Sequence, residues 1–218
     1  MKREIVQGEY YHVLNRGNNK QPIFKDERDR IRLLFSILYF QSPQTLNNIP
    51  KRINRYIEHR MFNTSEGVTN KILEERYVEL IGFVLMPNHF HLILRELKAG
   101  GISKYMQRVS NSFTKYSNTK NKTSGHLFQG SFKIIHIKDD NQLLYLSAYV
   151  HRNIREVKGW KNKEHLYPWS SFQDYVAENR WGELLKTDII LEQFPNKDKY
   201  KLFVKESGAK EECQTSDV

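Results

Sequence analysis

The stretch Tyr77-Val-Glu-Leu-Ile-Gly-Phe-Val-Leu-Met-Pro-Asn-His-Phe-His-Leu-Ile-Leu-Arg95 contains two apolar runs separated by Pro87. Proline cannot donate a hydrogen bond to the ladder of a central strand, so one long strand fits this stretch poorly. The Met86-Pro87-Asn88 segment instead has the composition of a tight turn. We therefore predict two antiparallel strands that pair across this turn.

Toward the N-terminus, residues 9–16 have the character of a strand and lead into a turn at Gly17-Asn18-Asn19. Asp26 then precedes apolar residues spaced by three and four, so we expect a helix to begin there. From Ser42 to about Arg76 the chain becomes polar and basic. We interpret this part as an insertion or a long, partly helical connection.

Toward the C-terminus, two more helices and a strand are expected. One helix follows Gly100-Gly101, with Ser103 as its expected N-cap, and a strand is expected at about residues 132–137. Asp139 and its neighbours provide the cap of a helix over residues 141–157. The buried stripe of that helix is expected to contain Leu143, Leu146, Val150 and Ile154.

Strands that alternate with helices in this way indicate an α+β fold with one central sheet. The length of 218 residues fits one domain with a small extension. We assign residues 1–180 to the domain, with residues 42–75 as the insertion or long connection. Residues 181–218 form a short helical extension that ends in a polar tail.

The charge of the chain suits a polyanionic partner, because 35 lysines and arginines against 25 aspartates and glutamates give a net charge of +10. Cys213 is the single cysteine, which excludes an intrachain disulfide and cysteine-based zinc sites. No apolar run is long enough to span a membrane, and no apolar signal sequence is present, so we expect a cytoplasmic protein without a membrane partner. The common motifs of nucleotide hydrolases, dinucleotide enzymes and serine hydrolases are absent from the sequence.

His89 and His91 are candidate metal ligands. Alternate residues of a strand share one face, so both imidazoles are expected to project together while Phe90 faces the opposite side. Two neutral imidazoles can bind one divalent ion. A His-x-His pair is more often two ordinary hydrogen-bonded histidines, so the pair alone does not identify a site.

Tyr149 and Asn153 lie four residues apart on one flank of the helix predicted at 141–157. An amide oxygen is a hard metal ligand, and a phenol one turn away could attack a group that the ion holds. Such a pair usually serves packing alone, and Tyr145 is an equally good nucleophile on spacing.

Lys104, Arg108 and Lys115 share a face of the helix after Gly101, which suits either phosphate binding or an ordinary solvated surface. Arg16, Lys133 and Arg152 are further candidates for DNA contacts. Aromatic residues between the basic ones could stack on unpaired bases, although some must be core: Tyr105, Tyr116, Phe128 and Phe132.

Five segments, in order, resemble the REP-associated tyrosine transposases, a branch of the HUH single-tyrosine transposases related to insertion-sequence transposases. They are residues 11–24, 86–94, 125–130, 149–153 and 167–172. The resemblance implies a ferredoxin-like α/β sandwich with a central antiparallel sheet. It also implies that Tyr149 is the nucleophile and that His89, His91 and Asn153 are the metal ligands.

The chain departs from the family pattern at three places. Ile154 stands where the family usually has proline, and Ser131 stands where arginine is common. Residues 42–75 are longer than the usual connection. No predicted catalytic residue is lost, but one expected phosphate contact is weakened and the DNA sequence preference is left open.

The resemblance implies a Mg²⁺- or Mn²⁺-dependent enzyme that cleaves and transfers single-stranded DNA beside a hairpin, through a 5′-phosphotyrosine intermediate. The hairpin would be REP-like or an insertion-sequence end. The alternatives are a regulator that binds nucleic acid without cleaving it, and an RNA-binding sheet, although the RRM aromatic signature is absent. The REP-associated branch implies a monomer and the insertion-sequence relatives imply a dimer, and we prefer the monomer.

Overall fold

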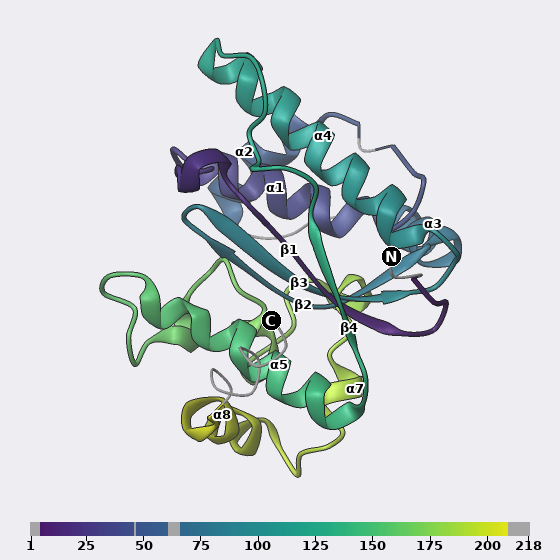
Figure 1. The fold of residues 1–218 in the computed structure, drawn as a ribbon, viewed down its shortest axis with the longest axis vertical. Helices are drawn as coiled ribbons and strands as arrows, with labels where there is room; N and C mark the ends of the chain where they lie inside the picture. The colour runs from purple at the N-terminus through teal and green to yellow at the C-terminus, as the bar shows by residue number, and fades with distance from the viewer. Residues whose placement is uncertain (1–4, 46, 61–65, 209–218) are drawn as a thin grey trace.

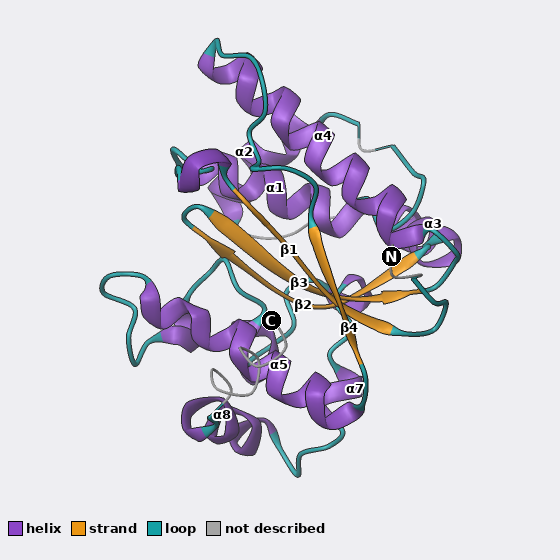
Figure 2. Cartoon of the chain, viewed as in Figure 1, coloured by secondary structure: helices purple, strands orange, loops and turns teal. Residues whose placement is uncertain are grey.

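The computed structural model describes residues 5–45, 47–60 and 66–208, and it has three layers, with helices on both faces of one sheet (Figures 1 and 2). The sheet has the order β2-β3-β1-β4, and all neighbouring strands are antiparallel. Its strands are β1 (Tyr10–Arg16), β2 (Val78–Met86), β3 (His89–Glu96) and β4 (Lys133–Ile137). The chain order β1-α1-β2-β3-α4-β4, apart from the inserted helices, is the ferredoxin-like arrangement that was predicted.

One helical layer contains α1 (Glu27–Tyr39), α2 (Ile49–His59) and α4 (Gly101–Asn121), with α3 (Glu66–Glu75) near the end of the sheet (Figure 1). The other layer contains α5 (Asp140–Arg152), α7 (Asp188–Leu191) and α8 (Lys197–Glu206), and α6 (Phe172–Val176) contacts α8. Two helices thus lie within residues 42–75, as expected. No helix in the described part of the chain has both the length and the apolar character needed to cross a membrane.

The strands β2 and β3 are buried on both faces, which explains their continuous apolar character. Phe90 of β3 faces the α4 layer, where its ring lies 5.8 Å from that of Phe128, which in turn contacts Phe113 of α4. His89 and His91 face the opposite layer, toward α5. The turn at Pro87 and Asn88 joins β2 to β3, as the sequence predicts.

Helix starts were predicted correctly for α1 and α5, where the side chains of Asp26 and Asp139 accept backbone hydrogen bonds. The prediction that Ser103 caps α4 is wrong. The carboxylate of Glu96, at the end of β3, accepts hydrogen bonds from the backbone N–H groups of Gly101 and Ile102 at 2.9 and 2.7 Å. The cap therefore comes from the preceding strand, which a search of the local helix sequence does not reveal.

Residues beyond 180 share the core of the preceding part. Trp181, Leu184, Ile190, Tyr200 and Val204 are buried in the same apolar cluster as the sheet, and α8 packs against α5. The expected helix at 141–157 is shorter than predicted, because α5 ends at Arg152 and continues as a 3-10 turn, η2 (Asn153–Glu156). The polar tail beyond Gly208 and Cys213 lie outside the described residues.

Candidate functional site

Three histidines meet on the sheet face that α5 covers. In the antiparallel register of β1 and β3, Leu14 pairs with His91 and Arg16 pairs with His89. The His12 ring stacks on His91 with 5.0 Å between ring centroids, and His12 Nε2 lies 2.8 Å from His91 Nδ1. When His91 donates this hydrogen bond, its Nε2 lone pair is left available to a ligand.

His89 is oriented by the turn that precedes it. Its Nδ1 lies 2.7 Å from Oδ1 of Asn88, an acceptor, so Nδ1 carries the proton and Nε2 keeps its lone pair. Asn88 is fixed in turn, because its side chain donates to Lys20 O at 2.9 Å and its carbonyl accepts from Gly17 N at 2.7 Å.

Gly17 allows this approach between the β1 turn and the β2–β3 turn. A Cβ atom at Gly17 would lie 2.3 Å from the backbone oxygen of Gln21 and 2.7 Å from Ile23 Cγ2. The turn predicted after the first strand therefore supports the orientation of His89 as well as the chain reversal.

The three imidazoles are neutral near pH 7. Burial lowers the pKa of His12 to about 4. Burial, followed by the positive charge of Arg16, lowers the pKa of His89 to about 4, and Glu156 partly opposes this. Burial and the neighbouring His12 and His89 hold the pKa of His91 well below its usual range. Neutral imidazoles are the form that binds metal ions.

Tyr149 lies directly against this histidine cluster. Its ring meets His91 edge to face at 5.7 Å and His12 at 6.2 Å between centroids. Tyr145 lies one turn earlier, and its ring packs on Phe203 of α8 at 5.4 Å. The two tyrosines that spacing alone could not separate thus have different surroundings.

Asn153 follows Tyr149 by one turn and is buried. Its side-chain nitrogen donates to the carbonyl oxygen of Tyr149 at 2.9 Å, so the amide is held on the same flank of the helix. The hydrogen bond occupies Nδ2 and leaves Oδ1 as the acceptor of this side chain. Leu143, Leu146 and Val150 of α5 are buried, as predicted, and the fourth residue of the predicted stripe, Ile154, is buried in η2.

A divalent metal bound by His89 and His91 would need an amide as its third protein ligand. Within the described residues, no group of three or more histidine, cysteine, aspartate or glutamate side chains is arranged to hold a metal ion. The Nδ1 atoms of His89 and His91 are already engaged, and Asn153 is the amide side chain expected to complete the set. Outer partners that orient metal-binding histidines through the second nitrogen are typical of metal sites.

The basic residues predicted to bind DNA lie in two separate layers. Arg16 and Lys133 are exposed on the sheet face of the histidines, since Lys133 pairs with Leu14 two residues from His12. Arg152, in the last turn of α5, also belongs to this layer. Its Nη1 donates to Ser207 Oγ at 3.4 Å. Lys104, Arg108 and Lys115 are on α4, across the sheet.

Arg108 does not extend the exposed basic face of α4 as expected. Its guanidinium donates to the carbonyl oxygens of Ser42 and Gln44 and to the hydroxyl of Tyr77, and it lies over the ring of Phe40. These contacts tie the start of the 42–75 segment to α4. The exposed lysines Lys104 and Lys115 remain on the helix surface.

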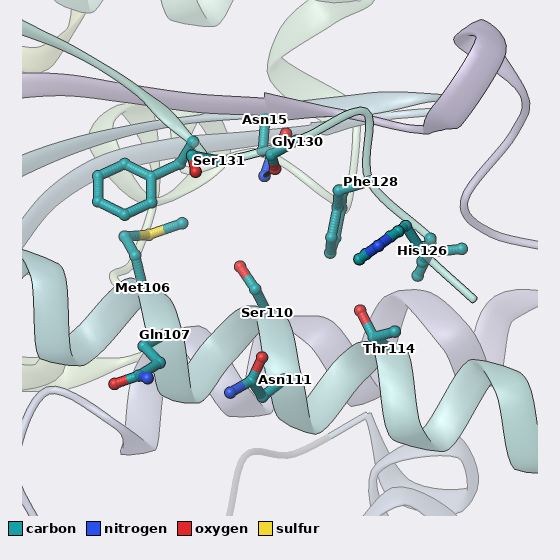
Figure 3. Close-up of a pocket in the computed structure, with 12 residues that line it drawn as sticks. Asn15, Met106, Gln107, Ser110, Asn111, Thr114, His126, Phe128, Gly130 and Ser131 are labelled. Atoms are coloured by element: carbon teal, nitrogen blue, oxygen red, sulfur yellow. Dashed lines mark hydrogen bonds between the residues drawn. The ribbon is translucent and has the colours of Figure 1, made fainter. Parts of the chain in front are cut away.

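A pocket of about 520 Å³ lies between α4 and residues 126–132 (Figure 3). Ser110 and Thr114 project from α4 toward Phe128 and His126 on the other wall. Asn15 closes one side, with its Nδ2 donating to Gly130 O at 3.2 Å. Among the aromatic residues considered for base stacking, Tyr105 and Phe128 are core residues, whereas Tyr116 and Phe132 are half-buried.

Sequence reasoning missed two neighbours of the histidine pair. The sequence motifs do not single out His12, and only the register of β1 against β3 places it beside His91. Glu156 lies close enough to His89 to raise its pKa. The available signal for His12 was its place on another predicted strand, at residues 9–16.

Comparisons with known proteins identify the family of the chain and a structure of similar fold. The family described as "Transposase IS200 like" matches residues 5–153. The structure of a REP-associated tyrosine transposase bound to a REP hairpin is similar in fold, with 16% identity, a TM-score of 0.52 and coverage of 87% of this chain and 92% of that chain. A candidate transposase from Deinococcus radiodurans R1 matches with 12% identity, coverage of 70% and 95%, and a TM-score of 0.29, which is too low to support an argument. No curated protein matches the chain.

Proposed function

The chain belongs to the IS200-like transposase family, and from this premise we propose that it cleaves and transfers single-stranded DNA, with Tyr149 as the nucleophile. The observation that carries the proposal is the edge-to-face contact of Tyr149 with His91 at 5.7 Å. It brings a phenol from α5 against the His-x-His strand, although the two are almost 60 residues apart in the sequence. The separate packing of Tyr145 on Phe203 supports Tyr149 over Tyr145.

We propose that His89, His91 and Asn153 would hold Mg²⁺ or Mn²⁺. The neutral imidazoles, their engaged Nδ1 atoms and the fixed amide of Asn153 support this ligand set. Carbonyl-type amide oxygens suit hard cations such as Mg²⁺ and Mn²⁺, and neutral imidazole is a common metal ligand in proteins. When bound, the metal would polarise the scissile phosphate and offset the charge that develops on it.

In the proposed reaction, Tyr149 Oη attacks the scissile phosphorus and loses its proton. The P–O3′ bond breaks as the O–P bond to tyrosine forms, and the departing 3′ oxygen takes up a proton to become a free hydroxyl. The ordinary pKa of tyrosine is about 10, so deprotonation accompanies the attack. The 5′-phosphotyrosine link conserves the bond for transfer to a second 3′-hydroxyl, and no nucleotide cofactor is required.

The charged residues around the histidines support a DNA path across this face. Arg16 and Lys133 are exposed beside the site, and we propose that they and Arg152 contact phosphates. On the other side of the sheet, the pocket between α4 and residues 126–132 has the size and the polar and aromatic lining for an unpaired base. The REP hairpin bound by the similar structure supports a hairpin as the DNA partner. We further propose a monomer as the working form.

The proposal is tested by incubating the protein with a hairpin-flanked oligonucleotide and Mn²⁺, then resolving the products on a denaturing gel. The wild type and Tyr145→Phe should form a covalent protein–DNA adduct. Tyr149→Phe should bind the oligonucleotide with unchanged affinity and form no adduct. Hairpin binding by the wild type without any adduct would contradict the enzyme and favour the regulator, and equal binding of RNA of the same sequence would favour the RNA-binding alternative.

A further inference from the structure

A second cavity, of about 690 Å³, lies between α1, α2 and α4. We call it the α2 groove; its lining includes Arg28, Arg32, Ile49, Pro50, Lys115 and Tyr116. These three helices belong to the layer opposite α5 (Figure 1), so the α2 groove is separated from Tyr149 by the sheet. The helix α2 lies within residues 42–75, so the groove exists because of that segment.

The lining of the α2 groove contains four cations, Arg28, Arg32, Lys115 and Lys120, and no carboxylate. The charge of Lys120 is compensated, because its Nζ lies 2.6 Å from carboxylate oxygens of both Asp26 and Asp29. Lys115 is exposed and forms no ion pair with the described residues. Whether the positive charges of Arg28 and Arg32 are compensated therefore depends on the groups that their guanidinium nitrogens contact.

The two arginines of the groove contact neutral acceptors. Arg28 Nη1 donates to Oδ1 of Asn54 at 2.7 Å, and Arg32 Nη2 donates to Oγ of Ser112 at 2.8 Å. Arg32 Nη1 is buried and has no hydrogen-bond partner within the described residues. Three positive charges thus converge on one cavity without a counter-charge, and an anionic ligand would compensate them.

The rest of the groove is apolar and aromatic. Ile49, Pro50 and Ile53 contribute one wall from the start of α2, and Tyr116 contributes its ring from α4. An inorganic anion would leave these surfaces unused. A nucleotide presents both a phosphate for the cations and a planar base for the apolar wall, and the cavity volume lies in the usual range for ligands of that size.

We propose that the α2 groove binds one unpaired nucleotide of the DNA strand, with its phosphate at Arg28 and Lys115 and its base against Tyr116 and the start of α2. This inference rests on the proposed function, because it takes DNA as the substrate. Since the sheet separates the groove from Tyr149, the groove contributes to DNA affinity and has no part in the cleavage step. It would give this chain an anchor that depends on residues 47–60.

The test measures binding of fluorescein-labelled dT20 to the full-length protein by fluorescence anisotropy over a series of NaCl concentrations. The variants are Lys115→Ala, Arg28→Ala and the double variant, with Lys199→Ala on the exposed side of α8 as the matched removal of one charge. Removing one phosphate-binding side chain should reduce the slope of log K against log salt by about 0.7. The double variant should bind at least about tenfold more weakly, whereas Lys199→Ala should stay within about twofold of the wild type.

The result that overturns the inference is a double variant that matches Lys199→Ala in affinity and salt slope. Lys115→Ala keeps the test valid if Arg28→Ala disturbs the α1–α2 contact, because Lys115 is exposed and its removal alone should reduce the slope by about 0.7. If rU20 binds more tightly than dT20, and the double variant weakens rU20 binding to the same extent, the groove would be assigned to RNA. That result would contradict DNA as the occupant. Adduct formation at saturating hairpin DNA is measured in parallel: absence of the adduct in the wild type rejects the proposed function, whereas an adduct with unchanged dT20 binding in the double variant rejects the α2 groove alone.

Discussion

His12 Nε2 lies 2.8 Å from His91 Nδ1, so the first strand of the sheet supplies a partner to the His-x-His strand. The contact joins β1 to β3 through side chains in addition to their backbone ladder. It engages Nδ1 of His91 and leaves Nε2 as the nitrogen available to the proposed metal. His12 is therefore the expected positioning residue for the proposed ligand His91, and we do not assign it as a ligand itself.

Replacing His12 with phenylalanine should weaken metal binding. The ring stacking on His91 is retained, but the hydrogen bond that fixes the His91 tautomer is removed, and loss of such outer partners typically costs 10–100-fold in metal affinity. Isothermal titration calorimetry with Mn²⁺ measures the change in metal affinity. His59→Phe, at an exposed site on α2, is the control; equal Mn²⁺ affinities of the two variants would show that His12 does not position His91.

Replacing Gly17 with alanine should destabilise the protein. The added Cβ would lie 2.3 Å from the carbonyl oxygen of Gln21, which is backbone and cannot move aside cheaply. Overpacking of this kind typically costs about 1–3 kcal/mol. Urea denaturation should show a lower free energy of unfolding than for Gly130→Ala, where a Cβ would meet nothing within 4 Å. Equal stabilities would refute the steric account of the turn.

Replacing Glu96 with glutamine should weaken the start of α4. The buried carboxylate accepts two backbone hydrogen bonds, and the amide keeps only one accepting oxygen while its NH₂ group faces a second donor. We expect the free energy of unfolding to fall by about 1–3 kcal/mol. Glu178→Gln at an exposed position is the matched control. An unchanged unfolding midpoint for Glu96→Gln would mean that the helix cap is dispensable.

Stability should fall in acid because the protein buries neutral histidines. Burial lowers the pKa of His151 to about 3, and this ring hydrogen-bonds Tyr200 and Ser171. The unfolded chain takes up a proton near pH 6.5 and the folded chain does not, so stability is full above about pH 6.5 and is lost as the pH falls toward 3. The loss is at most about 1.4 kcal/mol per pH unit for each such histidine.

Urea midpoints measured from pH 8 to pH 4 test this dependence. His151→Gln should lower the midpoint at pH 8, because the buried hydrogen bonds change, but should make the decline below pH 6.5 less steep. A wild-type midpoint that stays constant between pH 7 and pH 4 would contradict the burial of neutral imidazoles.

The β2–β3 hairpin and the starts of two helices follow closely from the sequence. Pro87 separates the two apolar runs into β2 and β3, and Asp26 and Asp139 begin α1 and α5 as expected. These features depend on neighbouring residues alone, so local chemistry determines them. The ferredoxin-like arrangement of the sheet was implied by the resemblance to the transposase family, because local patterns do not contain it.

The contacts that the sequence could not reveal all join distant parts of the chain. The cap of α4 by Glu96, the tie of Arg108 to Ser42 and the pairing of His12 with His91 depend on strand register and helix placement. Spacing on α5 left Tyr145 and Tyr149 equivalent, because both lie on the same side of one helix. Their neighbours separate them: α8 lies beside Tyr145 and the histidines lie beside Tyr149.

The most direct measurement is the identification of the side chain that carries DNA after reaction. The wild-type protein is incubated with hairpin DNA and Mn²⁺, digested with trypsin and a nuclease, and analysed by tandem mass spectrometry. Cleavage after Lys138 and Arg152 gives one peptide with both tyrosines, and its fragment ions distinguish them. We predict a 5′-nucleotide phosphate on Tyr149; a modified Tyr145, or a peptide that carries no nucleotide, would contradict the account.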